Sequence, residues 1–339
     1  MNPATDALAA VPSLLAAAIA ALISALIIWT SRSLLQRYAL ARPNARSSHR
    51  IPTPQGAGIA VIAATLLVAS AWAAWANIAI PPVLVAATVA IALVGFADDI
   101  KSLPVTVRLV LQAAAVGAVV FTSPETARIV PALPLALERS LLLFAGVWFV
   151  NLVNFMDGLD LMTVAEVVPV TAALLLLGWL GELSWPAVLI ATTLCGAMLG
   201  FAPFNRPVAK VFLGDVGSLP IGLLLGWCLL ELAWHGQPAA ALLLAAYYLA
   251  DSTITLFRRI VRREQFWSAH RTHFYQRATD NGFTVPRVIG EVLALNLVLA
   301  VLAIVTVHAG STAITLLALL AGTIAIAFVL RRFSRPQTS

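Results

Sequence analysis

The chain consists largely of long apolar stretches joined by short polar connections. A helix needs about 20 mostly apolar residues to cross the hydrocarbon core of a bilayer, and about eleven such stretches fit into the 339 residues. Only 11% of the residues are charged, against roughly 25% in an average soluble domain. We therefore expect an all-α polytopic membrane protein with one domain that spans residues 1–339. The predicted spans are residues 8–30, 55–75, 79–97, 104–122, 139–153, 163–180, 186–203, 218–234, 239–257, 286–308 and 312–330.

The distribution of Lys and Arg predicts how these spans are oriented. If the N-terminus lies outside, 19 of the 21 basic residues fall in cytoplasmic connections, and only Arg128 and Arg139 lie outside. Cytoplasmic loops of membrane proteins carry such an excess of basic residues, so we expect the N-terminus outside and the C-terminus in the cytoplasm. The predicted cytoplasmic loops are residues 31–54, 98–104, 154–162, 204–218 and 258–285.

The net charge of +6 does not predict a nucleic-acid partner, because the basic residues are distributed over five connections and do not follow one groove. Anionic headgroups of membrane lipids account for them better. Cys195 and Cys228 both lie inside predicted spans, so we expect small packing residues and no disulfide framework.

Carboxylates gather where predicted spans end on the cytoplasmic side. Asp98 and Asp99 follow one span, and Asp215 follows the short apolar segment that ends in Gly214. Ionisable groups at membrane depth are costly and are usually functional. The Asp98-Asp99 pair alone is equally well explained as an exposed helix end.

A second polar motif repeats every three residues through Asn151, Asn154, Asp157 and Asp160. Side chains at this spacing lie close to one face of a helix, so all four are candidates to line one cleft. A purely structural hydrogen-bond network is the alternative, because buried amides and carboxylates need partners.

The third motif contains Asn205 and the segment from Phe212 to Ser218 around Asp215. Glycines beside an Asp let backbone N–H groups approach an anion, and a carboxylate is a hard oxygen ligand of the kind that Mg²⁺ prefers. A tight turn followed by a helix cap explains the same residues.

Two basic loops complete the candidate site, one around His49 and one containing His270, Arg271 and His273. Arg guanidinium groups and imidazoles suit phosphate oxygens, although a solvated loop beside a membrane has the same composition. All five pieces fall on the same predicted face, which favours one substrate-binding site.

The order of these motifs resembles the polyprenyl-phosphate N-acetylhexosamine-1-phosphate transferase family. The motifs are the Asp pair, the Asn151-to-Asp160 motif, the Phe212-Leu-Gly-Asp215 segment and the late histidine loop. This is glycosyltransferase family 4, which includes phospho-N-acetylmuramoyl-pentapeptide transferase and the enzymes that start O-antigen synthesis. The resemblance extends from Ser47 to Gln276. It implies transfer of a sugar 1-phosphate from a UDP-N-acetylhexosamine-type nucleotide to undecaprenyl phosphate, with release of UMP. It also implies Mg²⁺, or Mn²⁺, as cofactor, and a bacterial inner-membrane location with the site facing the cytoplasm.

By matching position, the resemblance implies that Asp215 binds the metal and that Asp98 is either a base or an organiser of the acceptor phosphate. It adds Asp99 and His273 to the catalytic set, and it implies that Phe212 stacks on uracil. The full set of expected substrate-binding residues is His49, Arg108, Asn151, Asn154, Asp157, Asp160, Asn205, Phe212, His270 and Arg271.

The chain departs from the family pattern at two places. Tyr275 and Gln276 replace histidines, which resembles the O-antigen branch that handles UDP-linked deoxyaminosugars and argues against a muramoyl-pentapeptide substrate. We expect these two residues to select the donor sugar, with a scaffolding role in the loop as the alternative. Leu161 stands where the family usually has Gly.

A secondary transporter is the alternative function, because intramembrane carboxylates also mark ion paths. Transporter sites lie near the bilayer midplane on the broken helices of related halves, whereas these carboxylates cluster at one face and no internal repeat is evident. The donor sugar, the glycan pathway and the oligomeric state, a homodimer included, stay open.

Overall fold

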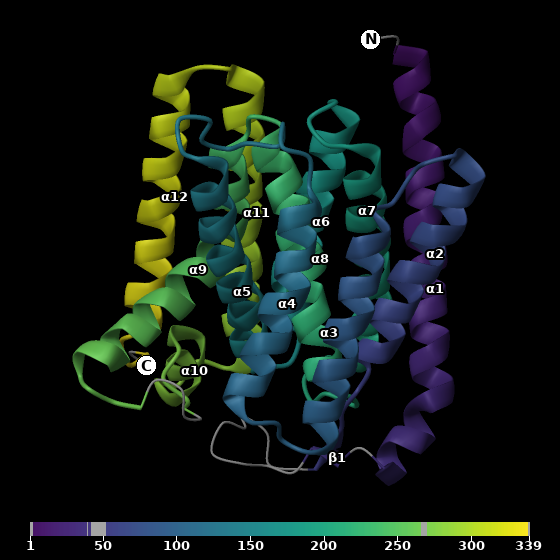
Figure 1. Cartoon of the computed structure of the whole chain (residues 1–339). Coiled ribbons are helices and arrows are strands. Elements are labelled where there is room, and N and C mark those ends of the chain that lie inside the picture. The colour runs from purple at the N-terminus through teal and green to yellow at the C-terminus, as the bar shows by residue number, and fades with distance from the viewer. Residues whose placement is uncertain (1–2, 39, 42–51, 266–269, 338–339) are drawn as a thin grey trace.

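The computed structural model describes residues 3–38, 40–41, 52–265 and 270–337, and eleven of its helices are long and apolar enough to cross a membrane. They run side by side as one bundle (Figure 1). The prediction of an all-α multi-pass membrane protein is therefore confirmed, while its orientation stays a prediction. The long helices are α1 (Pro3–Tyr38), α2 (Gly58–Ala76), α3 (Pro82–Ile100), α4 (Val105–Thr122), α5 (Leu135–Met156), α6 (Met162–Trp179), α7 (Trp185–Phe201), α8 (Asp215–Trp234), α9 (Pro238–Val261), α11 (Val285–Ala309) and α12 (Thr312–Phe333).

Three short elements lie near the lower end of the bundle in Figure 1, the end at which α1, α3, α5, α7, α9 and α12 finish. They are the helix α10 (Phe274–Asp280), the 3-10 helix η1 (Ala202–Phe204) and a two-stranded antiparallel sheet of β1 (Leu40–Ala41) and β2 (Thr53–Pro54). The first helix continues to Tyr38, beyond the predicted end at residue 30, because helix-favouring residues follow without a break.

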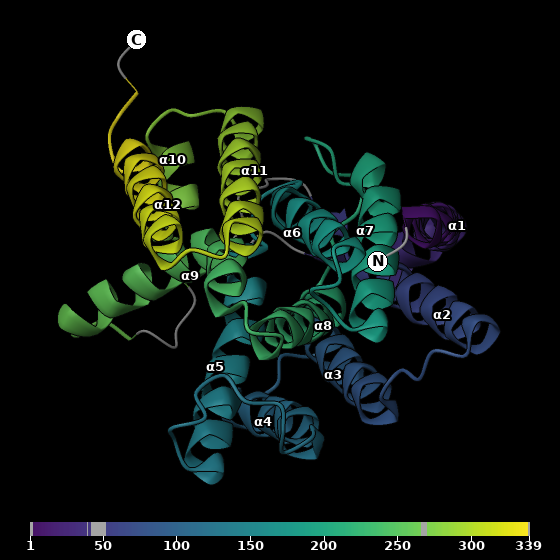
Figure 2. The same ribbon diagram turned by 90° about the horizontal axis from the view of Figure 1, so that it is seen from above.

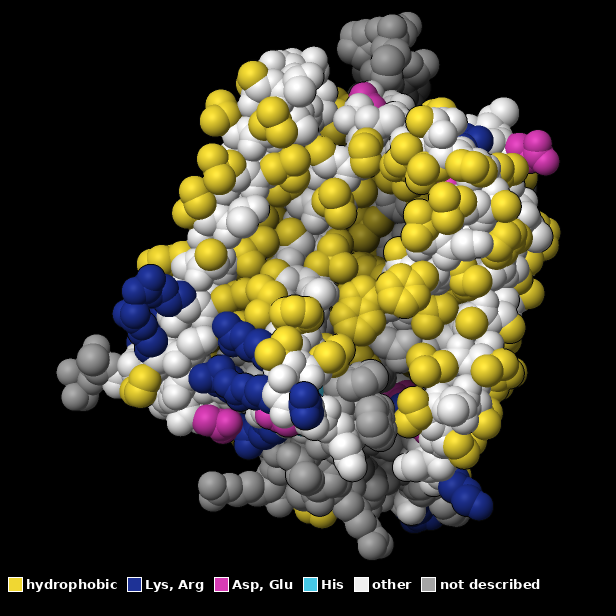
Figure 3. Space-filling view, turned by 60° about the vertical axis from the view of Figure 1, so that its left-hand side comes forward, with side chains coloured by type: hydrophobic (Ala, Val, Ile, Leu, Met, Phe, Trp, Pro, Cys, Tyr) yellow, Lys and Arg dark blue, Asp and Glu magenta, His cyan; other side chains and the backbone are white. Residues whose placement is uncertain are grey.

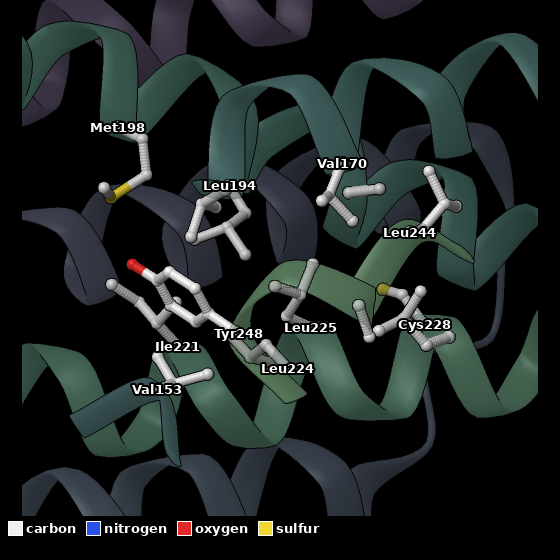
Figure 4. Close-up of a cluster of buried hydrophobic side chains, with 14 of the residues drawn as sticks. Val153, Val170, Leu194, Met198, Ile221, Leu224, Leu225, Cys228, Leu244 and Tyr248 are labelled. Atoms are coloured by element: carbon white, nitrogen blue, oxygen red, sulfur yellow. The ribbon is translucent and has the colours of Figure 1, made fainter. Parts of the chain in front are cut away.

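The core of the bundle is formed by α6, α7 and α8, as the view from above shows (Figure 2). Apolar side chains from these helices and α9 pack closely there (Figure 4). Cys195 and Cys228 are buried and free, as predicted. The outer helices instead expose apolar side chains such as Leu22 (71%) and Trp29 (70%) of α1, as expected for a surface that meets lipid tails.

Glycines allow the helices that carry the carboxylates to approach closely. A Cβ atom added at Gly95 of α3 would lie 2.2 Å from the backbone oxygen of Asp215, and one added at Gly58 of α2 would lie 2.2 Å from the Cα atom of Gly217. Only glycine tolerates backbone contacts of this kind. The end of α3 and the start of α2 are thereby held against the first turn of α8.

Candidate active site

Four of the predicted side chains form one polar cluster at the lower end of the bundle, contributed by α3, α4, α5 and α8. Arg108 Nη1 donates to Asp98 Oδ2 at 2.5 Å and lies 3.6 Å from Asp215 Oδ2. Asn154 Nδ2 donates to Asp215 Oδ1 at 2.7 Å and to Ser218 Oγ at 2.9 Å. The structure therefore brings Asp98, Arg108, Asn154 and Asp215 together, which we call the carboxylate cluster.

Asp99, the neighbour of Asp98, uses both carboxylate oxygens to hold the start of α8. Oδ1 accepts a hydrogen bond from the N–H of Asp215 at 2.9 Å, and Oδ2 accepts one from the N–H of Val216 at 3.0 Å. The preceding residue, Gly214, has no side chain that could cap the helix. Asp99 satisfies N–H groups that a helix start leaves unpaired and fixes the position of Asp215.

The Asp157-to-Leu161 segment lies against the chain between η1 and α8. Asp160 Oδ2 accepts a hydrogen bond from the N–H of Ala209 at 3.0 Å. The buried Asn205 accepts from the N–H of Leu161 at 2.6 Å and donates to the carbonyl of Val211 at 2.9 Å. Asn205 is thus engaged in joining two loops, while Asp157 and Asp160 remain partly exposed at the site.

Leu161 adopts a left-handed backbone with φ of 64°. Such a backbone is costly for a side chain other than glycine, which explains why glycine is usual at this position in the family that the sequence resembles. The chain nevertheless keeps the turn, because the hydrogen bond that the Leu161 N–H donates to Asn205 and the packing of the Leu161 side chain against the core hold it.

Asp157 is a carboxylate of this segment whose pKa is raised. Burial is the main cause that raises the pKa of Asp157 to about 6, with added contributions from the nearby charges of Asp99 and Asp160 and an opposing hydrogen bond from Thr163. A nearby like charge disfavours the ionised form of a carboxylate and a nearby cation favours it, so a cation bound beside Asp157 would favour its ionised form.

Phe212 precedes Asp215 in a segment that pairs with β2. Its N–H donates to the carbonyl of Pro54 at 2.8 Å, and its carbonyl accepts from Gly56 and Ala57 at 3.1 and 3.0 Å. The side chain of Gln55 in turn donates to the carbonyl of Asp99 at 3.1 Å. Phe212 is partly exposed, so its backbone is anchored while part of the residue stays accessible.

His273 lies at the start of α10 and is organised by a carboxylate that the sequence-based prediction missed. Asp251 of α9 is fully buried, and its Oδ1 lies 3.3 Å from His273 Nδ1. Its two oxygens also accept hydrogen bonds from the N–H groups of Phe274 at 3.0 Å and Tyr275 at 3.1 Å. The available signal was a carboxylate inside the predicted span 239–257, which is costly unless it has partners.

Tyr275 and Gln276 are buried, with 0% and 4% of their surfaces exposed. The Tyr275 hydroxyl donates to the carbonyl of Phe155 at 3.0 Å, and a Cβ atom added at Gly158 would lie 2.1 Å from this hydroxyl oxygen. Both side chains pack against the turn after α5. This geometry favours the scaffolding alternative over direct selection of the donor sugar.

The remaining predicted residues have separate positions. Asn151 donates to Gln112 Oε1 at 2.6 Å and to the carbonyl of Val147 at 2.8 Å, so its amide is used between α5 and α4. The ring of His270 stacks on that of His273 with centroids 5.0 Å apart. Arg271 forms an ion pair with Asp280 at 3.2 Å. His49 lies outside the described residues.

A divalent cation would find hard oxygen ligands in the carboxylate cluster. Asp98 and Asp215 both lie beside Arg108 Nη1, at 2.5 and 3.6 Å, although the described part of the chain contains no group of three His, Cys, Asp or Glu side chains arranged to hold a metal. Mg²⁺ commonly uses only one or two carboxylates and completes its shell with water and substrate phosphates. The donor set fits an ion that binds together with a phosphate substrate.

Residues 81–233 match the sequence profile of glycosyl transferase family 4. Over 211 residues the chain is 32% identical to decaprenyl-phosphate N-acetylglucosaminephosphotransferase of Mycolicibacterium smegmatis. This alignment covers 56% of this chain and 52% of that protein. The protein of the same name from Mycobacterium leprae is 28% identical, and the alignment covers 74% of this chain and 72% of that protein. Phospho-N-acetylmuramoyl-pentapeptide-transferase of Streptococcus thermophilus is 37% identical over 34% of this chain and 33% of its own length.

Two of these alignments thus span only about half and a third of the relatives' lengths. The matched region nevertheless contains the whole carboxylate cluster. The predicted relationship to the polyprenyl-phosphate hexosamine-1-phosphate transferases is confirmed, and the assignment to an O-antigen branch stays a prediction.

Proposed function

We propose that this chain, as a relative of the polyprenyl-phosphate hexosamine-1-phosphate transferases, transfers a sugar 1-phosphate from a UDP-sugar to a polyprenyl phosphate. In this reaction an oxygen of the acceptor phosphate forms a bond to the β-phosphorus of the nucleotide sugar. The bond between that phosphorus and the oxygen bridging to the α-phosphate breaks, and UMP leaves. The observation that carries the proposal is the carboxylate cluster, in which Arg108 lies between Asp98 and Asp215 at one end of a membrane bundle.

The central problem of this chemistry is that an anionic phosphate attacks an anionic pyrophosphate, so that charge neutralisation and positioning supply most of the catalysis. When bound at Asp215, Mg²⁺ or Mn²⁺ would neutralise charge on the pyrophosphate. Arg108 provides a fixed cation next to it, and Asn154 orients the Asp215 carboxylate through its hydrogen bond.

Asp98 has two proposed roles, a base or an organiser of the acceptor phosphate. Its Oδ1 accepts a hydrogen bond from the N–H of Leu103 at 2.6 Å, and its Oδ2 accepts from Arg108. Since both oxygens already have donors, this geometry supports the organising role, in which Asp98 holds Arg108 in place for the phosphate.

We further propose that undecaprenyl phosphate is the acceptor, that the product starts O-antigen or other cell-envelope glycan synthesis, and that the site faces the cytoplasm of the bacterial inner membrane. Tyr275 and Gln276 stand where the family pattern has histidines, which supports a donor other than the muramoyl-pentapeptide nucleotide. The position of the carboxylate cluster at the helix ends, away from mid-bundle, favours the enzyme over a transporter.

The test is to incubate purified protein with undecaprenyl phosphate and a panel of UDP-sugars, and to measure UMP release and the mass of the lipid product. The panel should contain UDP-GlcNAc, UDP-GalNAc and their 6-deoxy analogues. Metal-dependent release of UMP with formation of a lipid-linked sugar pyrophosphate is expected. Absence of UMP and lipid product with every donor would refute the proposal.

A further inference from the structure

A second polar pocket lies between the lower end of α9 and α10. Its lining contains four guanidinium groups and one carboxylate. The residues that line it are Thr255, Arg258, Arg259, Arg262, Glu264, Thr272 and Arg277. None of them belongs to the carboxylate cluster, and none is required by the proposed transfer reaction.

The positive charge of this pocket is not balanced by the described part of the protein. Glu264 is paired with Arg259 Nη1 at 2.8 Å. Arg258 lies over the Phe274 ring at 4.6 Å, and Arg262 and Arg277 have no side-chain hydrogen bond or ion pair within the ranges that the structure describes. Three arginines therefore face this region without a carboxylate partner.

Arg259 provides a separate indication that the pocket is built to receive an anion. The residue is 9% exposed and its side chain 11% exposed, and its Nη atoms reach Glu264 and the carbonyl of Gln265. Its Nε is buried and has no hydrogen-bond partner in the described chain. A buried donor without a partner is costly, and the side chain that carries it lines the pocket.

The end of α9 is amphipathic, and its outer face is apolar. Phe257, Ile260 and Val261 expose 64%, 51% and 66% of their surfaces, whereas Arg258 and Arg262 come from the same two turns. Figure 3 shows Lys and Arg side chains gathered at the lower end of this side of the molecule, below a surface of apolar side chains. Apolar and cationic residues combined in this way are typical of a helix that lies at the headgroup level of a membrane.

We propose that this pocket binds the phosphate headgroup of an anionic membrane phospholipid, with its acyl chains along Phe257, Ile260 and Val261. The planar guanidinium fork matches phosphate oxygens better than a point charge does. The adjacent apolar face distinguishes a lipid from free phosphate, which would gain nothing from it. The site is separate from the carboxylate cluster and does not depend on the proposed transferase activity.

The test is native mass spectrometry of the purified full-length protein in detergent, titrated with phosphatidylglycerol or with phosphatidylcholine. The test variant is Arg262→Gln with Arg277→Gln, which leaves the Arg259–Glu264 pair intact. The matched control is Arg331→Gln with Arg335→Gln, which removes two charges from the same end of the bundle outside the pocket. A basic residue near an anionic membrane surface is worth about 1 kcal/mol, so the test variant should bind phosphatidylglycerol about thirtyfold more weakly.

The proposal requires that the control variant bind phosphatidylglycerol like the unaltered chain and that phosphatidylcholine bind weakly to all three proteins. An equal loss of affinity in both variants would mean that only general surface charge is involved, and would overturn it. Displacement of phosphatidylglycerol by millimolar inorganic phosphate alone would make the site a free-phosphate site. Displacement by stoichiometric undecaprenyl phosphate would make it part of the acceptor site. Either result would also overturn the proposal.

Discussion

Replacement of Asp251 by Asn should destabilise the protein and detach the histidine loop from α9. Asp251 is fully buried and accepts backbone hydrogen bonds from Phe274 and Tyr275 through different oxygens, while His273 Nδ1 lies 3.3 Å from Oδ1. An amide has only one acceptor oxygen. Whichever way the Asn side chain turns, its NH₂ group faces at least one of the two backbone N–H groups.

The size of the effect follows from these contacts. A buried donor left without an acceptor costs about 1–3 kcal/mol, and loss of a negative charge at a helix N-terminus costs up to about 1 kcal/mol in addition. The expected loss in the free energy of unfolding is therefore about 1–4 kcal/mol. Within the proposed function, turnover should also fall, because the ring of His273 loses its orienting partner.

The assay is a dodecyl sulfate titration in mixed micelles, followed by the loss of helical circular dichroism. Asp280→Asn is the matched control, because Asp280 is the last residue of α10, its side chain is 54% exposed and it pairs with Arg271 at 3.2 Å. An exposed pair of this kind contributes about 0–1 kcal/mol. If Asp251→Asn unfolds at the same dodecyl sulfate fraction as Asp280→Asn, the assignment of Asp251 as the cap of α10 is wrong.

Three further predictions concern the carboxylate cluster and its surroundings. Asp215→Asn should abolish UMP release while the protein still elutes as a folded species in gel filtration, because the proposed metal ligand is lost but Asn154 keeps a partner. Normal turnover would contradict this. Gly95→Ala should lower the free energy of unfolding by about 1–3 kcal/mol through overpacking, because the added Cβ atom would lie 2.2 Å from the backbone oxygen of Asp215. The control Gly290→Ala should not lower it, because no atom lies within 4 Å of the added Cβ atom there. Phe212→Ala should raise the KM for the UDP-sugar about tenfold, since stacking on a base is worth about 1–3 kcal/mol, and an unchanged donor KM would make the ring structural only.

The eleven spans could be predicted because they depend on a single physical requirement that operates along the chain. Each span must bury its own backbone hydrogen bonds in lipid, so length and apolar content suffice to find it. The meeting of Asp98, Asn154 and Asp215 could also be predicted, because each residue follows or begins a span at the same predicted face. A shared face limits where polar side chains can go.

The contacts that position the site could not be predicted, because their partners are backbone groups. Asp99 bonds to N–H groups 116 and 117 residues away, and every residue except proline offers such a donor. The same holds for Asn205, whose partners are the N–H of Leu161 and the carbonyl of Val211. A side chain that recognises backbone leaves no complementary residue type in the sequence, so its partner can be found only in the fold.

Two of the helices that begin at the site, α8 and α10, are held by the same device. Gly214 lacks a side chain and the His273 ring does not cap its own helix, so Asp99 of α3 and Asp251 of α9 supply the missing acceptors to α8 and α10. Asp215 is the first residue of α8, and His273 immediately precedes α10. It follows that an inactive Asp99 variant would not identify Asp99 as a group that reacts with substrate, because loss of the cap would displace Asp215 by itself. Asp99→Asn should therefore be judged by stability and turnover together, and a catalytic role would require turnover to fall in a variant whose unfolding is unchanged.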